Sequence, residues 1–230
     1  MLAVYSCSPH VSKVTVDPVP HLNNDQLDTG AIQQALDELA ARCPSVTAAL
    51  AAVGYPSERR QEAGFGALVR IVVGQQVSTK AAAAIAARLE AALGGSVTPG
   101  AIASTDDASL RGAGLSAQKL SYLRALTEAV ESGQLPLDEL PALTDADAIA
   151  RITAVKGFGV WSAHMYLMFS LGRADIWPVG DLAIRAGFGR LLGLTERPTP
   201  KQTDVLAEPY RPYRSALALL CWKFYSEAPL

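Results

Sequence analysis

Apolar side chains recur at helical spacing along most of this 230-residue chain. After Asp28-Thr29, for example, the stretch AIQQALDELAARC places its apolar residues on one helical face. The same pattern predicts about ten helices joined by short turns, within 28–43, 44–54, 61–73, 78–95, 116–133, 145–155, 161–172, 181–193, 199–209 and 213–228. The alternation of apolar and polar residues that is typical of a β-strand occurs only in VSKVTV near the start. Residues 1–27 are therefore expected to form an extended arm, with one or two short strands at most.

Composition agrees with a helical globular protein, because half of the residues are hydrophobic and alanine is abundant. No apolar run approaches the roughly 18 residues that a membrane span needs, and the N-terminus lacks the features of a signal peptide. The cysteines Cys7, Cys43 and Cys221 are too scattered for a disulfide framework or a metal quartet. We therefore expect a cytoplasmic protein with no membrane partner, associated with the nucleoid if it is bacterial.

The formal net charge of −2 argues mildly against a protein that holds nucleic acid by charge alone. The charge is nevertheless uneven. Residues 1–150 carry 10 basic and 16 acidic side chains, whereas residues 151–230 carry 10 basic and 6 acidic ones. The C-terminal third could face a polyanion, but ordinary surface variation is the plainer explanation of the asymmetry.

The stretch VKGFGVWSA (155–163) has the form of a turn between two helices. Gly157 and Gly159 would allow a tight turn with positive φ and a close approach to a partner. The helix that begins near Val160–Ser162 would then direct its first N–H groups out of the turn, where they can bind a phosphate without any Lys or Arg. A GxG pair alone is weak, but the flanking helices and the Asp about twenty residues later strengthen the signal.

VKGFGVWSA followed by ADIWPVGDLAIRAG resembles the helix–hairpin–helix and Gly/Pro-Asp signature of a DNA glycosylase superfamily. IVVGQQVSTKAA (71–82), LRGAGLSAQKLSYL (110–123) and YRPYRSALALLCW (210–222) resemble further segments of that family. The alkylated-base branch, that of 3-methyladenine DNA glycosylases, is the most similar. The resemblance implies an all-α fold in which two helical lobes flank a DNA-binding cleft. Lobe A would comprise about 28–60 plus 175–230, and lobe B about 61–174.

The implied activity is hydrolysis of the N-glycosidic bond of alkylated purines that have been flipped out of double-stranded DNA. Bifunctional relatives carry a Schiff-base Lys where this chain has Trp161, so no lyase step is expected. The chain also lacks the four cysteines of the family's iron–sulfur loop. The resemblance implies no organic cofactor. It does imply a Na⁺ or K⁺ ion bound by the backbone carbonyls of Thr153, Val155 and Phe158. We expect a monomer.

Asp181, in PVGDLAIR, is the candidate catalytic residue. From the residues alone it reads equally well as an N-cap, the commonest role of an Asp at a helix start. The resemblance favours catalysis, because a carboxylate beside C1′ stabilises an oxocarbenium-like sugar and can activate water. Asp175 lies nearby and could be mistaken for the catalytic residue, but its expected role is a turn or surface contact.

A flipped cationic base would stack on electron-rich rings. By resemblance, Trp161 and Trp222 line the base pocket, with Phe158 beside them and Met165 where relatives carry another aromatic residue. Tyr166, Trp177, Phe224 and Tyr225 are weaker candidates, because aromatic residues at helical spacing usually belong to the core.

DNA contacts are expected at Gly157, Gly159 and Ser162 of the hairpin and at Gln75 and Gln76, where Gln76 matches the residue that fills the gap left by the flipped nucleotide. Helix capping is the plainer role for the two glutamines. Two other functions stay open: a non-catalytic helix–hairpin–helix DNA-binding module, and a different hydrolase or protein-interaction domain.

Overall fold

The computed structural model describes residues 27–228, and the predicted arm over 1–27 lies almost wholly outside them. Within the described residues the chain is all-helical, without a strand. Its α-helices are α1 (Thr29–Arg42), α2 (Pro44–Val53), α3 (Phe65–Gly74), α4 (Thr79–Ala92), α5 (Pro99–Ser104), α6 (Asp107–Gly112), α7 (Ala117–Glu131), α8 (Asp145–Thr153), α9 (Val160–Phe169), α10 (Leu182–Leu191), α11 (Pro200–Ala207) and α12 (Arg214–Glu227). Two 3-10 turns, η1 (Leu140–Ala142) and η2 (Glu208–Tyr210), complete the set.

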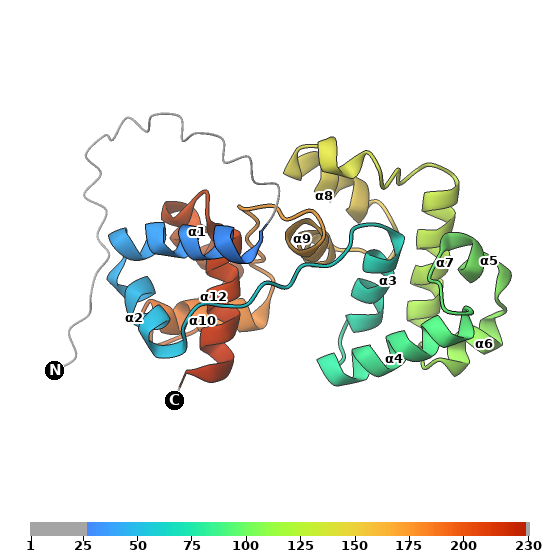
Figure 1. Cartoon of the computed structure of the whole chain (residues 1–230), viewed down its shortest axis with the longest axis horizontal. Coiled ribbons are helices and arrows are strands. Elements are labelled where there is room, and N and C mark those ends of the chain that lie inside the picture. The colour runs from blue at the N-terminus through green and yellow to red at the C-terminus, as the bar shows by residue number, and fades with distance from the viewer. Residues whose placement is uncertain (1–26, 229–230) are drawn as a thin grey trace. The chain divides into compact units, whose positions relative to one another are not determined.

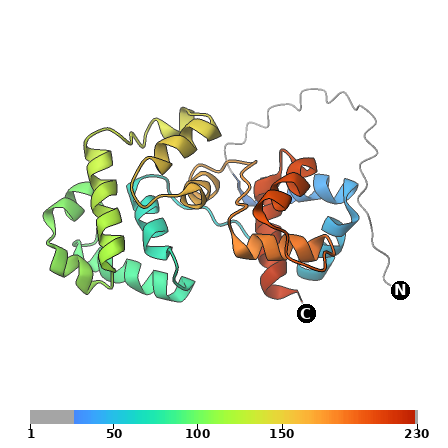
Figure 2. The same cartoon turned by 180° about the vertical axis from the view of Figure 1, so that it is seen from behind.

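The chain divides into two compact units (Figure 1; Figure 2). Of the described residues, 27–60 and 172–228 form the first unit, and 61–171 form the second. The described helices of the first unit are α1, α2, α10, α11 and α12, and those of the second are α3 to α9. The first unit therefore joins both ends of the described chain, whereas the second is one continuous segment.

Helix starts follow the capping residues that the sequence displays. Asp28, Ser78, Ser116 and Thr199 each accept a hydrogen bond from an N–H in the first turn of the next helix. At Thr199 the Gln202 side chain also returns to the cap, which completes a capping box. Local sequence thus sets these four boundaries.

Two expectations about the helices were wrong. The helix expected over 61–73 begins only at Phe65, because Gly64 at its N-cap has a φ of 119° and the Gln61 N–H donates to Phe169 O instead. The helices α5 and α6 were not predicted. Thr98 before Pro99 caps α5 and Asp106 caps α6, so a usable signal was present in both places.

In the first unit α12 is the central helix. Its residues 214–221 are all buried, and it packs on α1, α2 and α10. It lies close to α10 at Gly187, where a Cβ atom would stand 2.2 Å from the carbonyl oxygen of Cys221. Only a glycine lets the two backbones come this close, so Gly187 fixes the distance between α10 and α12.

In the second unit α3 and α9 are the most apolar helices and pack on each other. Tyr166 of α9 is fully buried, and its hydroxyl accepts a hydrogen bond from the Gly64 N–H at the start of α3. Burial raises the pKa of this phenol, so it stays neutral. None of the described helices is long and apolar enough to cross a membrane.

Candidate functional site

The predicted hairpin lies between α8 and α9 of the second unit, and Gly157 makes its turn. Gly157 has a φ of 94°, a region that L side chains rarely adopt. A Cβ atom there would stand 2.2 Å from Cγ of Tyr122, whose ring on α7 packs against the turn. Backbone conformation and packing therefore both require glycine at position 157.

Gly159 differs from the prediction. Its φ of −96° and ψ of 177° are ordinary extended backbone, so the expectation of a positive φ was wrong. Gly157 alone supplies the left-handed bend, which leaves Gly159 free to act as the extended N-cap of α9. A Cβ atom at Gly159 would meet nothing within 4 Å, and the residue is exposed. Open space at this point permits the backbone of another molecule to approach.

The first turn of α9 begins at Val160, which is 53% exposed. Gly159 offers no side-chain cap to this turn. Helix N-termini that present amide groups to solvent attract anions through both the N–H groups and the helix dipole. The start of α9 thus has the chemistry of a phosphate-binding site, and it needs no basic side chain.

Ser162 does not direct its side chain outwards. It is 3% exposed, and its hydroxyl accepts a hydrogen bond from Gln75 Nε2 at 3.3 Å. A direct hydroxyl contact to DNA is therefore not what this side chain offers. The same Gln75 amide donates to Gly157 O at 2.9 Å, so Gln75 ties the end of α3 to the hairpin.

Gln76 behaves differently from its neighbour. It is exposed and has a φ of 56°, the single non-glycine residue with positive φ among the described residues. This conformation is costly for a Gln, and such local strain concentrates at functional sites. The turn directs Gln75 inwards and leaves Gln76, which the resemblance matched to the gap-filling position, outside.

A polar hollow of about 410 Å³ adjoins this turn, and its lining includes Gln76, Ser116, Gln118, Lys119 and Tyr122. Lys119 Nζ donates to Val73 O at 2.7 Å near the end of α3. Desolvation lowers the pKa of this ammonium group. Sequence reasoning missed Gln118, Lys119 and Tyr122 as site residues, because they lie on α7, on a face that reads as an ordinary surface.

The carbonyl groups proposed for a monovalent cation lie where α8 ends and the hairpin turns. Val155 O accepts a hydrogen bond from the Phe158 N–H at 3.1 Å and has a second lone pair. The Thr153 hydroxyl donates back to Ile149 O, so this side chain stays on its own helix. A set of neutral carbonyl oxygens suits Na⁺ or K⁺. The described residues contain no group of three or more His, Cys, Asp or Glu side chains that could hold another metal ion.

The aromatic candidates separate by exposure. Trp161 and Trp222 are half-buried, as a ring that must receive a base would be. Phe158 and Met165 are only 5% and 6% exposed. Trp177 is 4% exposed, packs edge-on against Phe188 and donates its indole N–H to Thr203 O, so it belongs to the core of the first unit.

Two further aromatic candidates lie near the end of α12. Tyr225 is 48% exposed, and Phe224 is half-buried with the guanidinium carbon of Arg190 5.4 Å from its ring centroid. Trp222, earlier in the same helix, donates its indole N–H to Asp181. The ring that accompanies the carboxylate in the first unit is therefore that of Trp222.

Asp181 is the N-cap of α10. Its Oδ1 atom accepts hydrogen bonds from the N–H groups of Ala183 at 2.9 Å and Ile184 at 3.0 Å. The same oxygen also accepts the indole N–H of Trp222 at 3.2 Å. The capping role that the sequence suggested is thus real. It does not exclude chemistry, because three converging donors hold the carboxylate in one orientation.

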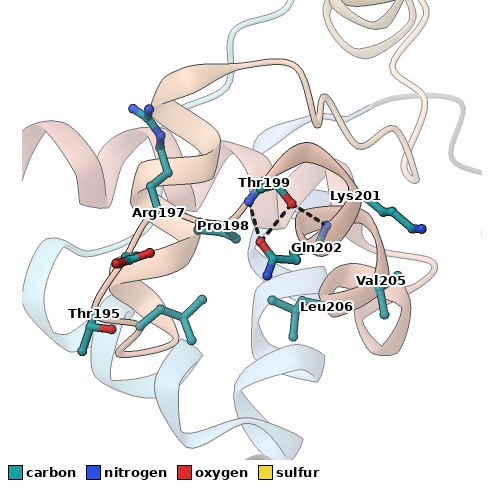
Figure 3. A pocket seen from close by; sticks show the side chains of 10 residues that line it. Thr195, Arg197, Pro198, Thr199, Lys201, Gln202, Val205 and Leu206 are labelled. Carbon is teal, nitrogen blue, oxygen red and sulfur yellow. Dashed lines mark hydrogen bonds between the residues drawn. The ribbon is translucent and has the colours of Figure 1, made fainter.

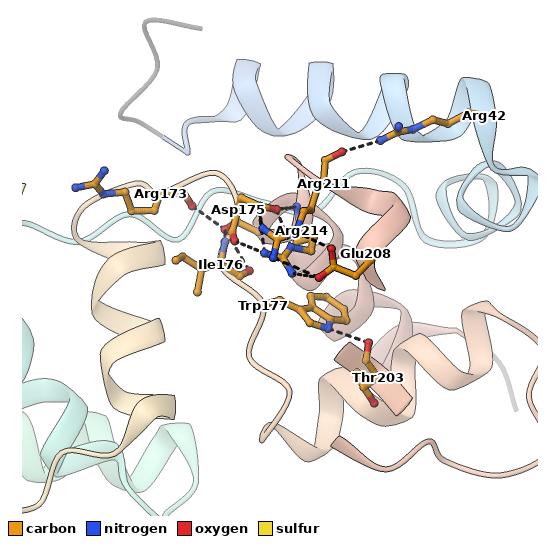
Figure 4. A network of polar contacts seen from close by, with 10 residues as sticks. Arg42, Arg173, Asp175, Ile176, Trp177, Thr203, Glu208, Arg211 and Arg214 are labelled. Atoms are coloured by element: carbon orange, nitrogen blue, oxygen red, sulfur yellow. Dashed lines mark hydrogen bonds and ion pairs between the residues drawn. The ribbon is translucent and has the colours of Figure 1, made fainter. Parts of the chain in front are cut away.

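Asp175 is more than the turn or surface residue that was expected. It accepts hydrogen bonds from the Arg214 side chain at 2.7 and 2.9 Å, and it also pairs with Arg211 (Figure 4). The Arg214 side chain is 7% exposed, which makes this a largely buried ion pair. Next to it, the Ser215 hydroxyl donates to Arg173 O and accepts from the Ile176 N–H. These contacts fasten the segment before Asp181 to the start of α12.

Another hollow lies in the first unit, and its lining does not include the candidate carboxylate. This groove of about 740 Å³ runs along residues 194–206, around the Thr199–Gln202 capping box (Figure 3). Its exposed apolar members are Leu194, Val205 and Leu206. Asp181 and Trp222 do not line it, so the carboxylate and its ring form a separate site.

The family model for "HhH-GPD superfamily base excision DNA repair protein" matches residues 69–212, more than half of the chain. The chain belongs to the HhH-GPD superfamily. The matched range contains the Gln75–Gln76 turn, the hairpin and Asp181, but it ends before Trp222. The predicted family and the all-α fold class are confirmed.

Named relatives and solved structures that are similar to this chain agree with the family assignment. The chain is similar to DNA-3-methyladenine glycosylase 1 of Schizosaccharomyces pombe, with 38% identity over 159 residues that cover 68% of this chain and 70% of the relative. A solved structure of the S. pombe 3-methyladenine DNA glycosylase in complex with abasic DNA superposes with a TM-score of 0.76 at 34% identity, covering 83% of this chain and 95% of that one. The DNA-3-methyladenine glycosidase of Bacillus halodurans follows, with a TM-score of 0.68, 37% identity and coverages of 74% and 78%.

Proposed function

We propose that this HhH-GPD protein is a monofunctional DNA glycosylase that removes alkylated purines of the 3-methyladenine type from double-stranded DNA in base excision repair. The similar proteins named above support the substrate class. The observation that carries the proposal is the carboxylate of Asp181, which two backbone amides and the Trp222 indole hold beside a half-buried aromatic ring.

Hydrolysis of an N-glycosidic bond passes through a sugar with oxocarbenium character. A fixed carboxylate next to C1′ stabilises this cation and can orient or deprotonate the attacking water. Because a methylated purine already carries positive charge, it leaves readily and requires less acid catalysis. One positioned carboxylate, Asp181, is therefore enough for the proposed chemistry.

DNA is held chiefly by the hairpin in this proposal. The amides at the start of α9 bind a backbone phosphate, and Gly159 leaves the space for it. A monovalent cation on the carbonyl groups of Thr153, Val155 and Phe158 would add positive charge at the same turn. This arrangement explains how a chain with a net charge of −2 can bind a polyanion.

Gln76 fills the gap that the flipped nucleotide leaves, since it is exposed and its amide can bond the orphaned partner base. Trp161 stands where lyase members of the family carry a Lys, so the product is an intact strand with an abasic site. The enzyme acts as a monomer, in the cytoplasm.

The test uses a duplex with one 3-methyladenine-type lesion and measures the free base by chromatography. The parent protein should release the base, and strands should break only after later alkali or heat. Borohydride should trap no covalent protein–DNA adduct. DNA binding without base release would instead identify a non-catalytic DNA-binding module, and a trapped adduct would contradict the monofunctional proposal.

A further inference from the structure

Trp222 has a second partner besides Asp181. The guanidinium carbon of Arg59 lies 5.7 Å from the centroid of the Trp222 ring. This distance is within the range of a cation–π interaction, and tryptophan is the ring that binds cations best. The edge of the indole therefore holds the carboxylate, while one of its faces holds a positive charge.

The contact is supported by the segment that carries Arg59. Residues 54–63 form no helix, but two side chains tether the stretch just before Arg59 to α1. The Glu58 carboxylate accepts hydrogen bonds from the Thr29 N–H and hydroxyl at 3.2 and 3.1 Å, and the Tyr55 hydroxyl donates to Asp37. Arg59 is thus held near α12 by its neighbours in the chain.

We propose that Arg59 determines how strongly the site distinguishes cationic from neutral purines, by occupying the cation-binding capacity of the Trp222 ring. This inference rests on the proposed function, since it assumes that a flipped base stacks on Trp222. Arg59 is a specificity-determining residue here and takes no part in bond breaking.

The direction of the effect does not depend on which face the base uses. A cationic base on the same face has to displace the guanidinium group. A cationic base on the opposite face shares one ring with a second cation, whose field weakens the attraction. A neutral purine stacks largely through dispersion and apolar burial, so the charge of Arg59 affects it much less. Arg59 therefore reduces the preference for cationic over neutral purines, so that the site accepts a broader range of bases.

The experiment compares single-turnover release of 7-methylguanine, which is cationic in DNA, with release of hypoxanthine, which is neutral, from the same duplex context. Arg59→Gln should raise the ratio of the two rates about two- to fivefold, the size of a cation–π contact at an exposed site. Arg59→Lys, which keeps the charge, should stay nearer the parent ratio. Arg60→Gln is the matched control, because it removes one positive charge from the next exposed residue. Any general loss of DNA affinity cancels in the ratio.

An unchanged or lower ratio for Arg59→Gln, or an equal rise for Arg60→Gln, would overturn the inference. The proposed function is judged separately, by release of 3-methyladenine, and a parent protein could pass that test and still release neither of these two bases. In that case a second measurement decides the inference: quenching of tryptophan fluorescence by 7-methylguanosine in mildly acidic buffer and by guanosine, with Trp222→Leu as the blank. Arg59→Gln should bind the cationic nucleoside two- to fivefold more tightly. An unchanged affinity would contradict the inference.

Discussion

The indole N–H of Trp222 donates to Oδ1 of Asp181 at 3.2 Å, and thereby connects α12 to the start of α10 across 41 residues of sequence. The contact depends on Gly187, which lets α10 and α12 approach closely, and on the Asp175–Arg214 ion pair, which fastens the preceding segment to α12. The candidate carboxylate is therefore positioned by three separate contacts within the first unit.

Asp181→Asn should separate chemistry from capping. The amide oxygen can still accept the three hydrogen bonds, so the melting temperature should change little. Base release should fall on the order of 100-fold or more, because a preorganised charge is lost. Asp181→Ala is the comparison: it should also lose about 1 kcal/mol of stability with the cap. Near-parental release by a folded Asn variant would reduce Asp181 to a cap.

Trp222→Phe keeps an aromatic ring and removes the N–H that holds Asp181. We expect kcat to fall roughly tenfold, in line with a hydrogen bond to a charged group, with a smaller change in KM. Trp177→Phe is the matched control, because it also removes an indole hydrogen bond in the first unit, to Thr203 O. The control should lower the melting temperature and leave kcat near the parent value. Equal kcat losses in both variants would indicate a general structural effect.

The two hairpin glycines should respond in opposite ways. Gly157→Ala should destabilise the protein by about 2 kcal/mol or more, because its φ is positive and Tyr122 fills the space. Gly159→Val should leave the melting curve nearly unchanged, since its backbone is extended and its Cβ meets nothing. DNA affinity of this folded variant should nevertheless fall at least tenfold, because the side chain enters the space proposed for a phosphate. Parental affinity would show that the hairpin is not the anchor.

Gly187→Ala should disturb the packing of α10 on α12. The added methyl group would stand 2.2 Å from Cys221 O, so the helices have to shift, at a cost of about 1–3 kcal/mol. Base release should fall even well below the melting temperature, because the Asp181–Trp222 contact spans the same two helices. Gly100→Ala, in α5 with open space around it, should be neutral or slightly stabilising. Normal base release by Gly187→Ala would show that the site does not depend on this packing.

The Asp175–Arg214 pair makes a prediction about stability. Asp175→Ala leaves the largely buried Arg214 without its main partner and should cost about 3 kcal/mol in the free energy of unfolding. Arg211→Met removes a half-exposed partner of the same carboxylate and should cost less than about 1 kcal/mol. Urea unfolding of both variants measures the difference. Similar losses would mean that burial of Arg214 is not the decisive factor.

Short stretches of sequence determined many of the helices of this protein and marked much of its candidate site. The helical spacing of apolar residues predicted most helices, and caps such as Ser78, Ser116 and Thr199 set where three of them begin, since those signals act within one turn. The hairpin and Asp181 were recognisable because their residues stand close together in sequence. The missed helices α5 and α6 were also marked locally, by Thr98 and Asp106.

Tertiary structure decided the rest, because those properties depend on neighbours that are distant in sequence. Gly157 and Gly159 look alike in VKGFGV, but Tyr122 makes one indispensable and leaves the other open. Gln75 and Gln76 are adjacent, yet contacts with Gly157 and Ser162 turn only the first inwards. No local pattern could place Arg59 and Asp181 on the same indole, since burial and side-chain direction arise only when α10, α12 and the segment after α2 pack together.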